Sequence, residues 1–177
     1  LGLMNLALRK LVEKGFTPMV TPTMVREFAL VGSGHFPAGR PEIYEVEEFS
    51  GTKDKETKFL VGTAEPSLLA YHADEVLNAK DLPIKLCGIS QSYRREVGGY
   101  GKDTKGLYRV HEFMKVEQVV ISKADHMESV HLHEEITANA EEIMQALGLH
   151  YRVVANCGGD LGLGQVKKYD IEAWTPS

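Results

Sequence analysis

Two stretches near the middle of the chain have the clearest alternation of apolar and polar positions. Residues 83–96, PIKLCGISQSYRRE, and residues 109–122, RVHEFMKVEQVVIS, follow the pattern of half-buried β-strands. Four glycines lie between these two runs, within residues 97–108. The pattern therefore predicts two long strands joined by a glycine-rich loop.

Two other stretches carry apolar residues at helical spacing, over residues 1–14 and 122–147. Gly15 and Gly148 follow directly and are typical stop signals for a helix. The second stretch is expected to bury one apolar stripe: Met127, Val130, Ile136, Ala140, Ile143 and Leu147.

The segment FTPMVTPTMV, residues 16–25, is predicted to be extended, because Pro18 and Pro22 are unsuited to a helix interior. Proline also removes a ladder hydrogen bond, so this segment is expected at a sheet edge or an interface. Further short elements are expected in the remaining chain: strands at 43–49, 58–62, 150–157 and 166–174, and a helix at 64–76.

The predicted strands lie beside hairpins and do not alternate regularly with helices. This arrangement favours an α+β fold with an antiparallel sheet flanked by helices. No internal repeat, low-complexity tract or linker interrupts residues 1–177, so we expect them to belong to a single domain.

Composition narrows the class of protein. The 177 residues are 43% apolar, and no apolar run reaches the roughly 20 residues that a membrane helix needs. Cys87 and Cys157 form no CxxC pair, which indicates reduced thiols and no cysteine-based zinc site. The net charge is −5, yet residues 94–109 carry an excess of three positive charges. The cationic site is therefore local.

Residues two apart on a strand share a face, so Arg94 and Glu96 are expected together, as are Phe113, Lys115 and Glu117. A guanidinium suits a phosphate, an aromatic ring suits a base and a carboxylate suits an amine. Such a face would fit a nucleotide joined to an amino-containing acid. Alternating charge on a solvated strand face is the other interpretation, and the pattern by itself leaves both open.

The segment GTAEPS adds a second candidate cluster just before a predicted helix. Thr63 and Glu65 offer a hydroxyl and a carboxylate that could hold an ammonium group. An acidic residue at a helix N-terminus also complements the helix dipole, so this segment alone does not identify a site.

The motifs together resemble the seryl-tRNA synthetase family of class II aminoacyl-tRNA synthetases. YRREVGGYGKDTKGLYRVHEFMKVEQVV, residues 93–120, resembles motif 2. VGTAEPSL, residues 61–68, resembles the serine-binding segment, and VGSGHFPAG, residues 31–39, resembles the loop before it. CGGDLGLGQVKKYDIEAW, residues 157–174, is similar to the segment after the long helix, and FTPMVTPTMV with the preceding helix is similar to motif 1.

The resemblance implies a role for each residue in a nucleotide site. Arg94 would be catalytic, holding the ATP α-phosphate and stabilising charge that develops there. Glu96 would accept a hydrogen bond from the adenine amino group, and Phe113 would stack on the adenine ring. Arg109 would lie near the phosphates, and Arg95 is included in the ATP-binding set.

The resemblance also implies where serine and tRNA bind. The glycine-rich loop, with Lys102 and Lys105, would meet the acceptor end of tRNA(Ser). The expected serine-binding residues are Thr63, Ala64, Glu65 and Glu117.

The implied activity is that of a serine–tRNA ligase using ATP and Mg²⁺, in a homodimer whose interface contains Pro22. The resemblance indicates a cytoplasmic protein with no membrane partner, and an organellar location stays open. The family's N-terminal tRNA-binding arm and motif 3 have no counterpart in residues 1–177, and its metal ligand is expected beyond Ser177, so no metal ligand is predicted within this chain. These residues alone are expected to be weakly active or inactive.

Two alternatives from other classes remain: a ligase that loads an amino acid onto a carrier protein, and a non-catalytic synthetase paralogue. A non-catalytic binding module need not keep Arg94, Glu96, Phe113 and Glu117, and all four are present.

Overall fold

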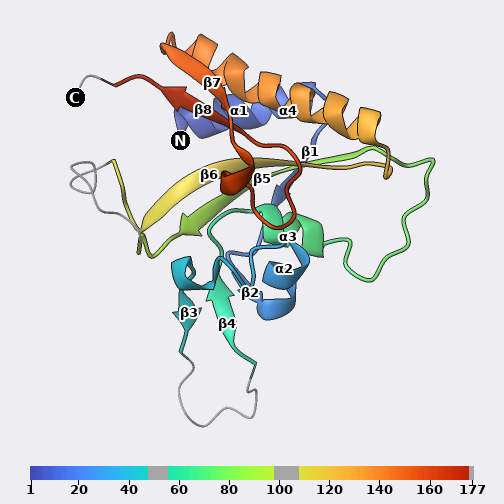
Figure 1. Ribbon diagram of the computed structural model, residues 1–177, viewed down its shortest axis with the longest axis vertical. Coiled ribbons are helices and arrows are strands. Elements are labelled where there is room, and N and C mark those ends of the chain that lie inside the picture. The colour runs from blue at the N-terminus through green and yellow to red at the C-terminus, as the bar shows by residue number, and fades with distance from the viewer. Residues whose placement is uncertain (48–55, 98–107, 176–177) are drawn as a thin grey trace. The chain divides into compact units, whose positions relative to one another are not determined.

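The computed structural model describes residues 1–47, 56–97 and 108–175 (Figure 1). The chain divides into two compact units, the first formed by Leu1–Asn78 and Lys85–Val119, the second by Ala79–Ile84 and Val120–Ser177. None of the helices in the described ranges combines the length and apolar character needed to cross a bilayer.

The main sheet of the first unit has the strand order β1-β5-β6. The long strands β5 (Ile84–Tyr93) and β6 (Glu112–Ile121) lie side by side in Figure 1, as their alternating pattern predicts. The strand β1 (Thr17–Val20) pairs with β5 in parallel, from Thr17 opposite Leu86 to Val20 opposite Ile89. β1 is an edge strand, which confirms the expectation from its prolines, and the helix α1 (Gly2–Glu13) precedes it.

A second, antiparallel sheet has the order β2-β4-β3. Its strands are β2 (Met24–Arg26), β4 (Lys58–Leu60) and β3 (Glu45–Val46). A cluster of buried apolar side chains joins this sheet to the helix α2 (Glu27–Gly32) and to the loop that follows the helix. Its members are Val25, Ala29, Leu30, Phe36, Ile43, Phe59 and Val61. The Phe36 and Phe59 rings meet edge to face with centroids 5.1 Å apart, which anchors that loop on the sheet.

Backbone hydrogen bonds connect the end of β4 to the end of β5. The Val61 carbonyl accepts from the Tyr93 amide at 2.8 Å, and the Arg94 amide donates to the His111 carbonyl at 3.1 Å. The segment after β4, the segment after β5 and the segment before β6 are thereby held next to one another.

The helix α3 (Glu65–Ala70) begins directly after the segment that follows β4. It is shorter than the predicted helix 64–76, since turns follow it and Asp74 has a left-handed backbone with φ of 63°. Leu68 is fully buried, and the Ser67 hydroxyl donates to the Pro22 carbonyl at 2.8 Å. The helix is therefore fixed on one face by packing and at its start by a tether to the segment after β1.

The second unit contains the helix α4 (His126–Ala146), which begins where the Asp125 carboxylate accepts a hydrogen bond from the Glu128 amide at 2.8 Å. The predicted apolar stripe is only partly right. Met127 is 71% exposed, and the buried apolar residue of this helix is Leu132, which the stripe did not include. The helix begins four residues later than predicted, because the Asp125 cap fixes its start.

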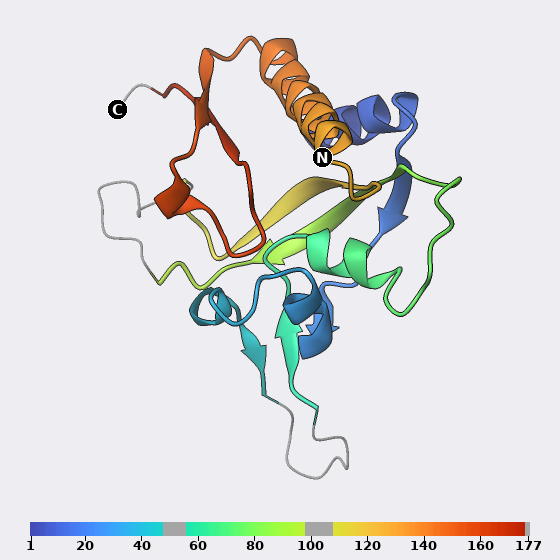
Figure 2. The same ribbon diagram turned by 45° about the vertical axis from the view of Figure 1, so that its right-hand side comes forward.

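The same unit contains an antiparallel pair, β7 (Tyr151–Ala155) with β8 (Tyr169–Ala173), which Figure 2 shows beside α4. Glu134 of α4 accepts hydrogen bonds from Lys167 and from the Tyr169 hydroxyl. These bonds lower the pKa of Glu134 and raise that of Lys167. Two 3₁₀ turns complete the described elements, η1 (Arg40–Glu42) and η3 (Gly158–Asp160).

Candidate active site

A cavity of about 820 Å³ lies in the first unit, where the segments after β4 and β5 meet the segment before β6. Five residues predicted to form the site line it: Thr63, Arg94, Glu96, Arg109 and Phe113. The remaining lining residues are His35, Gly39, Glu42, Ile43, Gly62, Tyr108 and Val110. The structure therefore brings five of the nine predicted ATP- and serine-binding residues together around one space.

Arg94 is fixed by contacts on two sides. Its Nε donates to the Gly62 carbonyl at 3.4 Å, and its guanidinium lies 5.4 Å from the centre of the Phe113 ring. These contacts use one donor and one face of the group. Within residues 1–47, 56–97 and 108–175 no hydrogen bond of the two terminal nitrogens is found, so they are placed to meet an anion in the cavity, as arginine does when it binds phosphate.

The prediction that Arg94 and Glu96 share a strand face was wrong in its reason. β5 ends at Tyr93, and Glu96 has a left-handed backbone with φ of 54°, so strand alternation does not apply to these residues. Both side chains nevertheless line the cavity, because the chain turns after the strand. A left-handed backbone is uncommon for a residue other than glycine, and residues in such conformations cluster at active sites and ligand-binding segments.

Glu96 and Arg109 form an ion pair at the rim of the cavity. The Glu96 side chain is 18% exposed and the Arg109 side chain 49% exposed. The pair connects the segment after β5 to the segment before β6. One carboxylate oxygen of Glu96 is engaged by this pair, and the carboxylate has further acceptor positions for a ligand.

Three side chains form a tight cluster next to the cavity. The Lys115 ammonium donates to Glu117 Oε2 at 2.6 Å and to Thr63 Oγ1 at 3.0 Å, and the Thr63 hydroxyl donates to the same Glu117 oxygen. Thr63 is buried, and Lys115 and Glu117 extend from one face of β6, as the strand pattern predicts.

Glu65 lies at the first position of α3, next to this cluster. Burial raises the pKa of Glu65, the nearby Glu117 carboxylate raises it further, and Lys115 lowers it. Ala64, the cap residue of α3, is fully buried and offers no side-chain hydrogen bond. Two carboxylates thus share a half-buried region with one ammonium group, which favours binding of a second cation there.

His35 extends the same region from the loop after α2. Its pKa is lowered chiefly by burial and then by the positive charge of Lys115, with a further lowering by Arg94. The Ser33 hydroxyl lies 2.9 Å from His35 Nδ1. The lowered pKa favours the neutral imidazole, and His35 lines the cavity together with Thr63 and Arg94.

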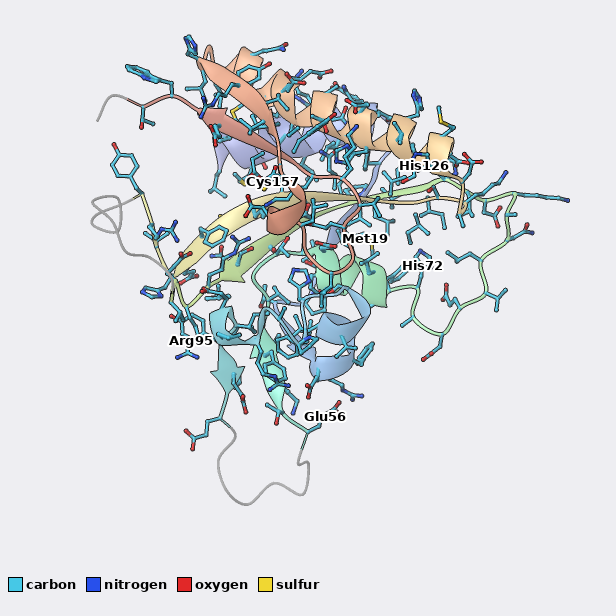
Figure 3. All side chains as sticks on the ribbon, viewed as in Figure 1. Met19, Glu56, His72, Arg95, His126 and Cys157 are labelled. Carbon is cyan, nitrogen blue, oxygen red and sulfur yellow. The ribbon has the colours of Figure 1, made fainter. Side chains whose placement is uncertain are left out.

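Arg95 points into a different space from its neighbour Arg94. It lines a separate hollow of about 660 Å³ with Arg40, Tyr44 and Phe59, and Figure 3 shows its side chain at the edge of the first unit. The structure therefore does not bring Arg95 into the cavity. Lys102 and Lys105 lie outside the described residues.

Pro22 is exposed in the segment after β1, and its carbonyl is the acceptor for Ser67. Among the described residues no group of three or more histidine, cysteine, aspartate or glutamate side chains is placed to hold a metal ion.

Comparison with known proteins identifies the kind of domain that carries this site. Residues 44–177 match the family described as the tRNA synthetase class II core domain (G, H, P, S and T). The chain belongs to this family. The match confirms the class II resemblance and the α+β fold predicted from the sequence.

Two similar proteins are serine–tRNA ligases. One from Pyrococcus horikoshii is 49% identical over 99% of this chain and 37% of its own length. One from Deinococcus radiodurans is 44% identical over 100% of this chain and 40% of its own length. The chain thus spans less than half the length of these relatives.

Two solved structures show the same fold. The seryl-tRNA synthetase from Pyrococcus horikoshii complexed with ATP has a TM-score of 0.86 and 49% identity, covering 97% of this chain and 36% of that chain. The cytoplasmic serine–tRNA ligase from Naegleria fowleri in complex with AMP has a TM-score of 0.87 and 37% identity, covering 97% and 38%.

Several residues of the site had no role in the prediction from sequence. His35 and Gly39 lie in the segment VGSGHFPAG. This segment was predicted to be a loop similar to one in the family, and none of its residues was given a role. Lys115 was placed on the correct strand face, and its spacing from Glu117 was the available signal for a contact. Tyr108 and Glu42 carried no recognisable signal, because Tyr108 reaches the cavity from a bend and Glu42 from the short 3₁₀ turn η1.

Proposed function

We propose that this chain forms the serine- and ATP-binding core of a serine–tRNA ligase, and that residues 1–177 belong to one catalytic domain. The observation that carries the proposal is the adjacency of two sets of groups in the first unit. Arg94, Glu96 and Phe113 line the cavity, and Thr63 joins its wall to Glu117. The class II core match and the serine–tRNA ligase relatives support it.

In the first step, the serine carboxylate attacks the α-phosphorus of ATP, a P–O bond forms and pyrophosphate leaves. The Arg94 guanidinium, held by Gly62 and Phe113, stabilises the negative charge that builds up on the α-phosphate oxygens. Such a step depends on positioning and electrostatics, and no covalent protein nucleophile takes part.

The remaining groups position the two substrates. Phe113 stacks on the adenine, Glu96 accepts from its amino group and Arg109, which pairs with Glu96, lies near the phosphates. Thr63, Glu65 and Glu117 bind serine, the carboxylates taking its ammonium and hydroxyl groups, and Ala64 packs beneath them. Arg95 is left out of the ATP set because its side chain lines the neighbouring hollow.

In the second step, a ribose hydroxyl of the terminal tRNA(Ser) nucleotide attacks the seryl carbonyl and AMP leaves. We assign Lys102 and Lys105 to the acceptor end of the tRNA, because lysines in a loop suit its phosphates. Mg²⁺ ordinarily accompanies ATP in phosphoryl chemistry and neutralises part of its charge.

The protein is proposed to act in the cytoplasm as a homodimer. The relative from Naegleria fowleri is named as cytoplasmic. Pro22 is exposed beyond the edge strand β1, whose Val20 is 97% exposed, so this edge is suited to a partner copy. Analytical ultracentrifugation tests the dimer, and a monomer at micromolar concentration would rule it out.

ATP–pyrophosphate exchange tests the proposed function, using the protein expressed from its complete gene. We expect exchange that depends on serine and is weak with alanine, threonine or glycine. A charging assay then compares tRNA(Ser) with an acyl-carrier protein. Exchange with charging of the carrier alone would favour a carrier-protein ligase. No exchange with any amino acid would indicate a non-catalytic paralogue.

A further inference from the structure

Lys115 is the one cation in the cluster that joins the two proposed serine-binding groups Thr63 and Glu117. Its ammonium lies within hydrogen-bonding distance of both, 3.0 Å from Thr63 Oγ1 and 2.6 Å from Glu117 Oε2. The Lys115 side chain is 35% exposed and that of Glu117 18% exposed, so solvent screens this pair only in part.

The donors and acceptors of the cluster have a fixed order. Lysine only donates, so the Thr63 oxygen must accept from Lys115 and turn its own proton toward Glu117. Both donors converge on Glu117 Oε2, and no hydrogen bond of the other carboxylate oxygen is found within the described ranges. Glu117 is therefore oriented through one oxygen and offers the other as an acceptor.

The charges around Lys115 are unequal. Glu117 already has a cation at 2.6 Å, whereas Glu65 on α3 has no ion pair within the described ranges and is raised in pKa by burial and by Glu117. An incoming ammonium group therefore gains more at Glu65 than at Glu117. A neutral donor such as a hydroxyl is the better partner for the free oxygen of Glu117.

We propose that Lys115 is a positioning residue for serine. Its ammonium orients the Thr63 hydroxyl and the Glu117 carboxylate so that Glu117 presents one free oxygen as an acceptor. Glu65 then binds the ammonium group of the substrate. This inference rests on the proposed function. Lys115 acts through Thr63 and Glu117, and it need not touch either substrate. Removing Lys115 would leave the half-buried Glu117 carboxylate without its ionic partner and would free the Thr63 hydroxyl to change orientation.

The first test compares Lys115→Met with Lys85→Met in serine-dependent ATP–pyrophosphate exchange, using the protein expressed from its complete gene. Lys85 also extends from a strand of the main sheet, yet its ammonium lies over the Phe16 ring at 5.6 Å, away from the site. We expect Lys115→Met to raise the KM for serine about 10- to 100-fold with the KM for ATP changed less than about twofold. Lys85→Met should change neither.

A conservative variant separates positioning from a general structural role. Lys115→Arg retains the positive charge and donors, so it should recover a large part of the serine affinity that Lys115→Met loses. Equal changes in the KM values for serine and ATP, or a serine KM unchanged by Lys115→Met, would overturn the proposal.

A second measurement is independent of activity. Lys115 lowers the pKa of both Glu65 and His35, so Lys115→Met should move both titrations to higher pH in NMR of labelled side chains. The other charged groups acting on these two residues are Glu117 from β6 and Arg94 from the segment after β5, and neither is substituted in this variant. Lys85→Met should leave both midpoints unchanged.

The two measurements distinguish the inference from the function on which it rests. If the wild-type protein ignores serine, the proposed function fails and the positioning role for serine fails with it. If the wild-type protein responds to serine but Lys115→Met moves neither titration nor the serine KM, only the role of Lys115 fails. A raised serine KM together with raised Glu65 and His35 titrations supports it.

Discussion

The two ends of the candidate site hold their charged groups differently. At the amino-acid end, Lys115, Thr63 and Glu117 contact one another, and the Glu117 side chain is 18% exposed. At the nucleotide end, Arg109 is 49% exposed and its described ion pair is with Glu96 on a turn beyond a strand end.

This difference fits the size of the two proposed ligands. Serine offers few atoms, so its recognition requires acceptors that are already oriented and partly shielded from water. ATP is large and highly charged, so a more open set of guanidiniums and one aromatic ring can bind it through many contacts. The amino-acid end should therefore be sensitive to small chemical changes, and the nucleotide end mainly to loss of a whole group.

The largest effect is expected from Arg94→Ala, which removes the group fixed by Gly62 and Phe113. Exchange should fall about 100- to 1000-fold in kcat, because charge on the α-phosphate loses its stabilising donors. Arg94→Lys keeps the charge without the planar fork and should recover only part of the rate. A kcat within about threefold of wild type for Arg94→Ala would show that another group stabilises this charge.

Glu65→Gln should act in opposite directions on binding and stability. The KM for serine should rise about 10- to 100-fold, because an uncharged amide replaces the partner of the ammonium. The pKa of Glu65 is raised in the folded state, so ionising it opposes folding as pH rises from its unfolded value, near 4.5, through its folded value.

Glu65→Gln removes that opposing effect, so its Tm relative to wild type should be higher at pH 8 than at pH 4. Thermal unfolding at the two pH values measures this difference. Glu45→Gln is the control, because Glu45 lies exposed on the edge strand β3. A Tm difference that stays constant with pH would mean that Glu65 is not held in an unfavourable charged state.

Phe113→Leu should weaken ATP binding about tenfold with little change in the KM for serine, because an aromatic face is lost under the base. Phe113→Tyr keeps the ring and should stay near wild type. Steady-state kinetics with each substrate varied in turn gives the two KM values. A serine KM raised as much as the ATP KM would mean that the two ends are not separable.

Arg95→Ala should have the smallest effect, with exchange kinetics within about twofold of wild type, because its side chain lines the separate hollow. Comparison with Arg94→Ala tests whether the two adjacent arginines differ in their effect on exchange, as expected from the different spaces that their side chains line. A large rise in the ATP KM would return Arg95 to the nucleotide set.

The sequence pattern predicted β5 and β6 to within a few residues, with a glycine-rich run between them. Burial does not follow a strict alternation, however, because β5 buries Leu86, Cys87 and Gly88 in succession and β6 is half-buried along most of its length. The same alternation failed at Glu96, where the chain has already left the strand. A period of two fixes the face of a residue only while the strand continues. The prediction that Arg94 and Glu96 lie at the same site was thus correct, but its reason was wrong.

Contacts between segments distant in sequence were harder to predict. Strand spacing placed Lys115 beside Glu117, but the part played by Thr63 depends on how β4 joins the end of β5 through Val61. Arg95 was included in the ATP-binding set with Arg94, yet its side chain lines a separate hollow, since consecutive side chains of an extended chain point in different directions. Helix α4 illustrates the same limit, since Leu132 and not the predicted Met127 is buried.

The parallel pairing of β1 with β5 has a consequence for how the protein folds. Thr17 lies opposite Leu86. The ribosome must therefore synthesise the intervening chain, which contains all strands of the β2-β4-β3 sheet, before β1 can pair with β5. Contacts between residues so far apart in sequence slow folding. During synthesis, Arg94 and Lys115 emerge after these segments, so the pocket can assemble only once β6 has left the ribosome.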